Sequence, residues 1–200
     1  MTVDEPRGYA KGRATRQAIL DEAMALFGEV GYRSASLRGI AARSGITHPG
    51  LLHHFPTKQA LLLAVLEHRD QVDAARFALD HEVGVAVLDS LVELTALNVT
   101  RPGIVELYCV LSAEATAREH PAHEYFAARY ARTVSCLTDA FTHAVTVGDA
   151  PADLDPASAA RRLVALMDGL QVQWLLDRDG VDMVADLRTH LSGQLTRPTT

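Results

Sequence analysis

Two short amphipathic segments follow each other near the start of the chain, and they restrict its fold more than any other feature of the sequence. The first reads SLRGIAARSG, with Ser36 as a candidate N-cap and Gly45 as its stop. The second reads THPGLLHHFP, with Thr47 as the cap and Pro56 as the stop. A proline at the second helical position, Pro49, costs little because its N–H would have no partner there. Each segment is therefore predicted to form a helix of about two turns.

Two such helices, joined by a short turn containing glycine, describe a helix-turn-helix. In that motif the second helix enters the DNA major groove and touches base edges with its first turn, so a longer helix adds little. We therefore expect Thr47, His48, Pro49 and Gly50 to face the bases. His53 lies one and a half turns further on, where a side chain reaches a backbone phosphate instead.

The charges are unevenly distributed along the chain. Residues 1–58 carry eight Lys/Arg against five Asp/Glu, a net of +3, whereas the whole chain has a net charge of −6. This asymmetry predicts an anion-binding end, with a solvated basic surface as the alternative. Lys58 starts the next predicted helix, where the dipole and free N–H groups favour a phosphate. Arg38, and Arg13 or Arg16, are further candidates for phosphate contacts.

The rest of the chain also shows a helical pattern, because apolar residues recur every three or four positions and no strand pattern competes. Thr15 is a candidate cap for the first helix, and Gly31 is expected to end it in a left-handed C-terminal cap, with Tyr32 packing back on the last turn. Asp155 and Asp182 are N-cap signals. Further helices are predicted over 58–81, 87–97, 104–119, 122–145, 156–176 and 183–195.

The composition favours a soluble, cytoplasmic protein. Hydrophobic residues make up 48% of the chain, which is enough for a buried core. The longest apolar runs, such as 61–66, are shorter than the roughly 18 residues that a membrane span needs. The start MTVDEPRGYAKGR lacks the apolar segment of a signal peptide. Cys109 and Cys136 lie inside apolar helical patterns, so we expect reduced thiols rather than a disulfide.

Three motifs stand at fixed positions in residues 15–66. They are AxxLFxxxGY (Ala23, Leu26, Phe27, Gly31, Tyr32), IAxxxGI (Ile40, Ala41, Gly45, Ile46) and HFxxK (His54, Phe55, Lys58). Together they resemble the DNA-binding end of TetR-family transcriptional regulators. Leu52 stands where a phosphate-bonding tyrosine is common, so we leave it out of the expected contacts, and Pro49 stands where glycine or alanine is common. His54 matches a family position that packs and can bond phosphate.

The resemblance implies an all-α protein of about nine helices. It places a three-helix, helix-turn-helix DNA-binding domain in residues 1–57, and a helical ligand-binding and dimerisation domain in residues 58–200. A two-fold dimer presents two reading helices about 34 Å apart, or a multiple of that, and so selects a palindromic operator. The implied function is a repressor that a small-molecule effector releases from DNA by shifting the fourth helix. No cofactor is implied.

The helix predicted over 156–176 is apolar on more than one side, so one side can face the core and another a partner. Gly169 would allow close backbone approach there. A helix buried centrally in one subunit is the alternative. The helices over 156–176 and 183–195 are together expected to form the dimer contact that the resemblance implies. The residues of this contact are Leu163, Met167, Leu170, Trp174, Val184, Leu187 and Leu191.

A sensor also needs a cavity, whose expected walls are the helices over 104–119, 122–145 and 156–176. Tyr108 and Ser112 are four residues apart on one helix, and Tyr125 and Trp174 are aromatic with a polar tip. Such groups line apolar pockets, although ordinary core packing would explain them too. These four residues are the candidate ligand contacts.

Two other classes of protein compete with this interpretation. One is a small-molecule- or metal-binding helical module or enzyme without specific DNA binding, although the sequence holds no GxSxG, P-loop, GxGxxG or HExxH motif. His120 and His123 have flanking carboxylates, but Pro121 between them disturbs a metal-ligand geometry, and we predict no metal site. The other is a helical interaction module whose basic end has no role in DNA binding.

Overall fold

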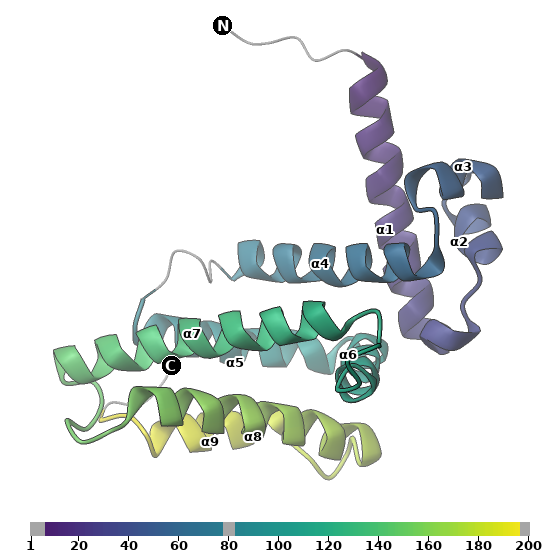
Figure 1. Ribbon diagram of the computed structural model, residues 1–200. Helices are drawn as coiled ribbons and strands as arrows, with labels where there is room; N and C mark the ends of the chain where they lie inside the picture. The colour runs from purple at the N-terminus through teal and green to yellow at the C-terminus, as the bar shows by residue number, and fades with distance from the viewer. Residues whose placement is uncertain (1–6, 78–82, 197–200) are drawn as a thin grey trace, which may run out of the picture. The chain divides into compact units, whose positions relative to one another are not determined.

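The computed structural model describes residues 7–77 and 83–196, with side chains from Gly12 onward. Within these ranges the chain forms nine α-helices and no strand, which confirms the predicted all-α class (Figure 1). None of the helices in the described ranges is long and apolar enough for a membrane span. The helices are α1 (Arg7–Ser34), α2 (Leu37–Arg43), α3 (His48–His54), α4 (Lys58–Arg76), α5 (Val85–Val99), α6 (Pro102–Glu114), α7 (His123–Val147), α8 (Pro156–Leu176) and α9 (Met183–Ser192).

The chain divides into two compact units, Met1–Asp70 and Gln71–Thr200. Helix α4 is continuous across this division, because it begins at Lys58 in the first unit and ends at Arg76 in the second. The functional division between residues 57 and 58 stays a prediction, since compactness and function need not change at the same residue.

Helix α1 differs from the predicted helix at both ends. It begins at Arg7, so Thr15 lies inside the helix and is not its cap. Gly31 has φ 77° and ψ 158°, a conformation that glycine tolerates and that interrupts the helix, but it is not the left-handed cap that we expected. The Tyr32 ring packs edge-on against Phe27 with 5.5 Å between centroids, as predicted.

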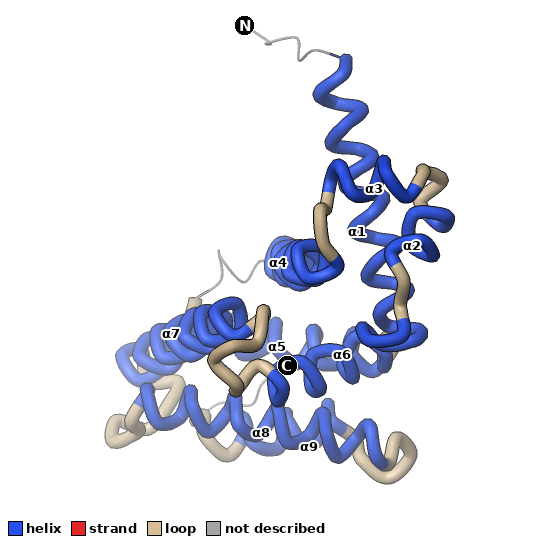
Figure 2. Tube along the Cα trace, turned by 45° about the vertical axis from the view of Figure 1, so that its right-hand side comes forward, coloured by secondary structure: helices blue, strands red, loops and turns tan. Residues whose placement is uncertain are grey.

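The two short helices have the predicted caps. The Ser36 hydroxyl accepts the Gly39 N–H at 3.0 Å, and the Thr47 hydroxyl accepts the Gly50 N–H at 3.2 Å. Gly45, in the turn between them, has φ 67°, where a side chain would be strained. Helices α2 and α3 lie side by side in the first unit (Figure 2). The local sequence therefore builds the helix-turn-helix as expected.

The second unit contains α5 to α9, with α7 packed along α8, and α5 packed against α7 and α9. One of its core clusters includes Leu88, Leu137, Phe141 and Leu163. The predicted caps of the last two helices are present. Asp155 accepts the Ala157 N–H at 3.1 Å, and Asp182 accepts the Ala185 N–H at 3.0 Å.

Two predicted helix ends are too long, and a third lies outside the described residues. Helix α6 ends at Glu114 rather than 119, because side chains hold the following turns: His123 Nδ1–H donates to the Ala115 carbonyl at 2.8 Å, and His120 Nδ1 accepts the Ala122 N–H at 3.2 Å. Helix α9 ends at Ser192 rather than 195. Helix α4 ends at Arg76, and the predicted end at residue 81 lies outside the described residues.

Candidate nucleic-acid interface and effector region

Helix α3 is anchored by one apolar side. Leu51 is fully buried and Phe55, its C-cap, is 3% exposed. The predicted DNA contacts of this helix lie on its other sides: Thr47, Pro49 and His53 are exposed, and His48, Gly50 and His54 are half-buried. The first turn is therefore open to a groove while the helix stays fixed to its unit.

Positive charge lies at the end of α3. The Arg16 guanidinium of α1 stands over the Phe55 ring, 4.8 Å from its centroid, and Phe55 caps α3. The His53 and His54 rings meet edge-on at 5.7 Å. The sequence named Arg16 as one of several phosphate candidates, and this contact fixes it beside the end of the reading helix.

Two of the basic residues in the first unit differ in their surroundings. Arg38 is exposed in the first turn of α2. Arg43 instead donates from Nε to Glu22 at 2.9 Å and from Nη1 to Glu29 at 2.6 Å. The hydrogen bond from Arg43 lowers the pKa of the Glu29 carboxyl. Arg43 thus ties α2 to α1, and the segment's charge asymmetry overstates the charge that DNA can use.

Lys58 already has partners within its own unit. Its ammonium donates to the Arg33 carbonyl at 3.0 Å and lies 4.6 Å from the Tyr32 ring centroid. Burial lowers the pKa of Lys58. Because an ammonium has three N–H donors, a phosphate can be added without removal of the Arg33 contact.

In the second unit, the structure brings two of the four candidate ligand residues together. The hydroxyls of Tyr108 and Tyr125 are 3.2 Å apart, and Phe126 packs edge-on against both rings. Ser112 donates to the Cys109 carbonyl of its own helix at 3.1 Å. Trp174, 4% exposed, belongs to a separate cluster with Val105, Leu170 and Met183.

A polar pair that the sequence reasoning missed lies between α7 and α8. Tyr130 donates its hydroxyl hydrogen to Asp168 at 2.9 Å. Burial raises the pKa of Asp168, and burial together with the nearby Asp168 charge raises the pKa of Tyr130. Asp168 is the single acidic residue in the run LVALMDGLQVQWLL, a signal that could have identified it. A half-buried carboxylate that accepts a tyrosine hydroxyl is a group that can orient a bound molecule.

Cys109 should react slowly with alkylating reagents. Burial, followed by the charges of Asp168 and Glu106, raises the pKa of its thiol to about 11 from a value of 9.0. At pH 8 the thiolate is then about 100-fold scarcer, which the higher nucleophilicity of a more basic thiolate offsets only in part. We expect iodoacetamide to modify Cys109 at least about tenfold more slowly in the folded protein than in urea. Peptide mass spectrometry measures both rates, and equal rates would contradict the buried environment.

The predicted dimer residues are mostly part of this chain's own core. Leu163, Leu187 and Leu191 are fully buried, Leu170 is 7% and Trp174 4% exposed, and Met167 and Val184 are half-buried. The outer side of α8 carries a different stripe. It consists of Ala165, Gly169, Val172 and Leu176, and we call it the outer stripe of α8.

The outer stripe is apolar and accessible. Val172 is 47% exposed and Leu176 is 84% exposed. A Cβ added at Gly169 would meet no atom within 4 Å, so the space beside the α8 backbone is open at that point. Two small residues followed by two large apolar ones allow a second helix to approach closely.

The histidines considered as metal ligands have other roles. His120 Nε2 is 3.8 Å from Glu114, and both His120 and His123 support the turns after α6. In the part of the chain that the structure describes, no three His, Cys, Asp or Glu side chains come together to hold a metal ion.

Comparisons with known proteins agree with this geometry. Residues 19–65 match the model for bacterial regulatory proteins of the tetR family, and residues 86–196 match the model for the C-terminal part of BetI-type transcriptional repressors. The probable HTH-type transcriptional regulator ArpR of Pseudomonas putida is 27% identical over 196 residues, which cover 90% of each protein.

Solved structures show the same fold. Salmonella enterica GusR superposes with a TM-score of 0.69 at 29% identity, covering 92% of this chain and 96% of that chain. SmeT, the repressor of the Stenotrophomonas maltophilia multidrug efflux pump SmeDEF, superposes with a TM-score of 0.73 at 22% identity, covering 94% and 96%. The two family models together cover the helix-turn-helix and most of the second unit. The chain therefore belongs to the TetR family and is a DNA-binding transcriptional regulator, not an enzyme.

Proposed function

We propose that this regulator is a repressor that binds a palindromic operator as a homodimer and leaves it when a small molecule binds the second unit. The observation that carries the proposal is that α3 is buried on one side and exposed at its first turn. Leu51 and Phe55 fix the helix to its unit, while the exposed Thr47 and Pro49 leave its first turn open. A two-turn helix held in this way can enter a major groove.

The proposed DNA contacts divide into two kinds. Thr47, His48, Pro49 and Gly50 meet base edges, because the first turn of a reading helix lies deepest in the groove. The other contacts go to backbone phosphates, from Arg38, His53, His54 and Lys58. Residues 1–57 thus carry the reading function, and residues 58–200 carry effector binding and dimerisation.

The outer stripe of α8 supports the proposed dimer. A solvated protein seldom leaves a leucine as open as Leu176 beside other apolar side chains unless a partner covers it. In a two-fold dimer the stripe would pack on its own copy, with Gly169 at the closest approach. Met167 and Val184, two of the predicted dimer residues, pack instead against this chain's own core, and the buried leucines of α8 and α9 hold the two helices in place behind the stripe.

The polar groups between α6, α7 and α8 support the proposed effector site. Tyr108, Ser112, Tyr125 and Trp174 are its predicted contacts, and the Tyr130–Asp168 pair adds an oriented hydrogen-bonding group. One solved structure with this fold is a SmeT–triclosan complex, so that protein holds a small molecule. The match to the model for BetI-type repressors supports repression as the direction of control.

A DNA titration tests the proposal. Fluorescence anisotropy would follow binding to duplexes from upstream of the protein's own gene and to random duplexes, at several salt concentrations. We expect a preference for one palindromic duplex and a steep loss of affinity with salt, because phosphate contacts release counterions. Equal binding to every duplex would overturn the proposed function.

Two substitutions separate base contacts from phosphate contacts. Lys58→Ala should weaken all duplexes alike and reduce the salt slope by about 1, whereas His48→Ala should change the preference among duplexes. Lys58→Arg keeps the positive charge but changes the group that donates to the Arg33 carbonyl. It therefore shows whether an effect of Lys58→Ala comes from the charge or from this hydrogen bond. Arg118→Ala, in the turn after α6, removes one exposed positive charge from the second unit and should change neither quantity. If Lys58→Ala leaves the salt slope unchanged, Lys58 is not a phosphate contact.

A further inference from the structure

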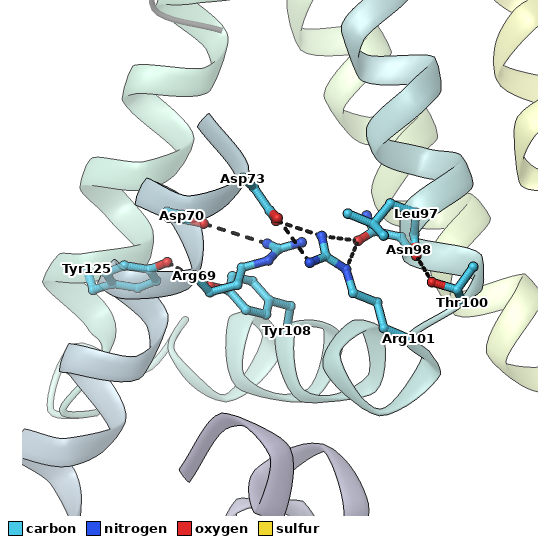
Figure 3. A network of polar contacts seen from close by, with 9 residues as sticks. All are labelled: Arg69, Asp70, Asp73, Leu97, Asn98, Thr100, Arg101, Tyr108 and Tyr125. Carbon is cyan, nitrogen blue, oxygen red and sulfur yellow. Dashed lines mark hydrogen bonds and ion pairs between the residues drawn. The ribbon is translucent and has the colours of Figure 1, made fainter. Parts of the chain in front are cut away.

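The last turn of α4 is held inside the second unit by an ion pair between Asp73 and Arg101, which we call the clamp (Figure 3). Asp73 is a 4% exposed carboxylate. Arg101, the N-cap of α6, donates to it from both ends of its guanidinium, Nη1 to Oδ1 at 3.0 Å and Nη2 to Oδ2 at 2.7 Å. A bidentate pair at a buried carboxylate has a fixed geometry, and the loss of one partner is costly.

The same guanidinium is oriented by Asn98. The Asn98 side-chain oxygen accepts from Arg101 Nε at 3.0 Å and from Nη2 at 2.9 Å. Arg101 therefore lies between two acceptors, one on α5 and one on α4. Because Nη2 donates to both, a movement of Asn98 changes the direction in which Arg101 points at Asp73.

Asn98 also forms part of the wall of a small cavity. The cavity has a volume of about 10 Å³, and its walls include Thr95 and Asn98 of α5 and Met167, Leu170 and Gln171 of α8. Gln171 reaches in addition toward α6, where its side-chain oxygen lies 3.8 Å from the Cys109 sulfur. It is one turn from Asp168, in the proposed effector region. Gln171 of α8 therefore lies between the effector region and the cavity whose wall contains Asn98.

We propose that Asn98 is the positioning residue that connects the effector region to α4. A ligand that moves α8 at Gln171 repacks the cavity wall, which displaces the Asn98 carboxamide. Arg101 then loses its second acceptor and releases Asp73. This inference rests on the proposed function, and it assigns the regulation of that site to three side chains.

The expected effect on DNA binding follows from the position of α4. The helix begins at Lys58 in the unit that carries the reading helix, and its last turn, which contains Asp73, belongs to the second unit. A dimer binds a palindrome only when its two reading helices have the right spacing. If the clamp opens, α4 samples more orientations, and the apparent affinity falls with the fraction that fits the operator.

A double-mutant cycle on operator affinity tests the inference in the full-length protein. We expect Arg101→Gln to weaken operator binding about tenfold and Asn98→Ala about fivefold. Because both act through the same clamp, the double variant should stay near tenfold rather than reach the product of the two. The salt slope should not change, since no phosphate contact is lost.

The chain offers a matched control in the same turn. Thr100 donates its hydroxyl hydrogen to the Leu97 carbonyl at 2.7 Å, within α5 and not toward α4. Thr100→Ala should therefore lower thermal stability without weakening operator binding, either alone or combined with Arg101→Gln. Hydrogen exchange gives a second readout: amides in residues 72–76 of α4 should exchange faster in Asn98→Ala, although Asn98 lies on α5.

The outcomes separate this inference from the proposed function. If the wild type prefers its operator and the effects of Asn98→Ala and Arg101→Gln multiply, or Asn98→Ala binds like the wild type, the inference is overturned. If the wild type prefers no duplex, the proposed function fails, and hydrogen exchange at residues 72–76 still decides whether Asn98 supports the clamp. Should Asn98→Ala not fold, Asn98→Ser and Asp73→Asn go through the same cycle.

Discussion

Phe27→Ala is expected to unfold the first unit and abolish operator binding while the second unit stays folded. Phe27 is fully buried on α1 and packs edge-on against Tyr32. Truncation of a buried phenylalanine costs about 3–5 kcal/mol, because apolar contacts are lost and a cavity remains. That loss is a large part of the stability of a unit this small. Hydrogen exchange, resolved by peptide, would show fast exchange in α1 to α3 and unchanged protection in α5 to α9.

Tyr32→Phe is the matched control for this experiment. It keeps the ring that meets Phe27 and the face that lies near the Lys58 ammonium, and it removes only the hydroxyl. We expect a change below about 1 kcal/mol and near-normal operator affinity. If Phe27→Ala melts like the wild type and still binds operator, the core of the reading unit does not depend on this ring.

Helix caps and short turns could be predicted from the sequence because they depend on residues a few positions apart. Thr47, Asp155 and Asp182 cap the helices that they were expected to cap. The predicted start of α1 was wrong because a cap-forming residue such as Thr15 can also lie inside a helix. The predicted end of α6 was wrong because His123 donates to a carbonyl eight residues earlier, a hydrogen bond that the helical period of the sequence does not reveal.

The candidate sites depend on contacts between residues far apart in the chain, which the sequence pattern predicts less well. Lys58 bonds the carbonyl of Arg33, and Arg43 bonds Glu22, so the use of each charge is decided by the tertiary structure. The Tyr130–Asp168 pair joins residues that are 38 positions apart. Periodicity also showed that α8 is apolar on several sides, but it could not say which side faces the core.

The outer stripe of α8 makes the most sensitive test of the proposed dimer. Leu176→Glu removes a side chain worth about 1.5–3 kcal/mol on burial, and a two-fold contact uses each residue twice. A carboxylate left in the contact adds a further cost. We therefore expect the dimer dissociation constant to rise by at least about 100-fold, since each tenfold corresponds to about 1.4 kcal/mol. Sedimentation velocity over a range of concentrations measures this constant, and operator affinity should fall with it.

Two further variants separate the stripe from a general effect of the substitution. Val99→Glu changes a 39% exposed valine of α5 in the same way and should leave the dimer intact. Gly169→Ala should act with opposite sign in two assays. In the monomeric Leu176→Glu background it stabilises the fold by up to about 1 kcal/mol, because alanine favours a helix and its Cβ meets open space. With Leu176 intact, the same methyl group holds two α8 helices apart and weakens the dimer. A Gly169→Ala protein that dimerises as tightly as the wild type would show that the stripe faces solvent.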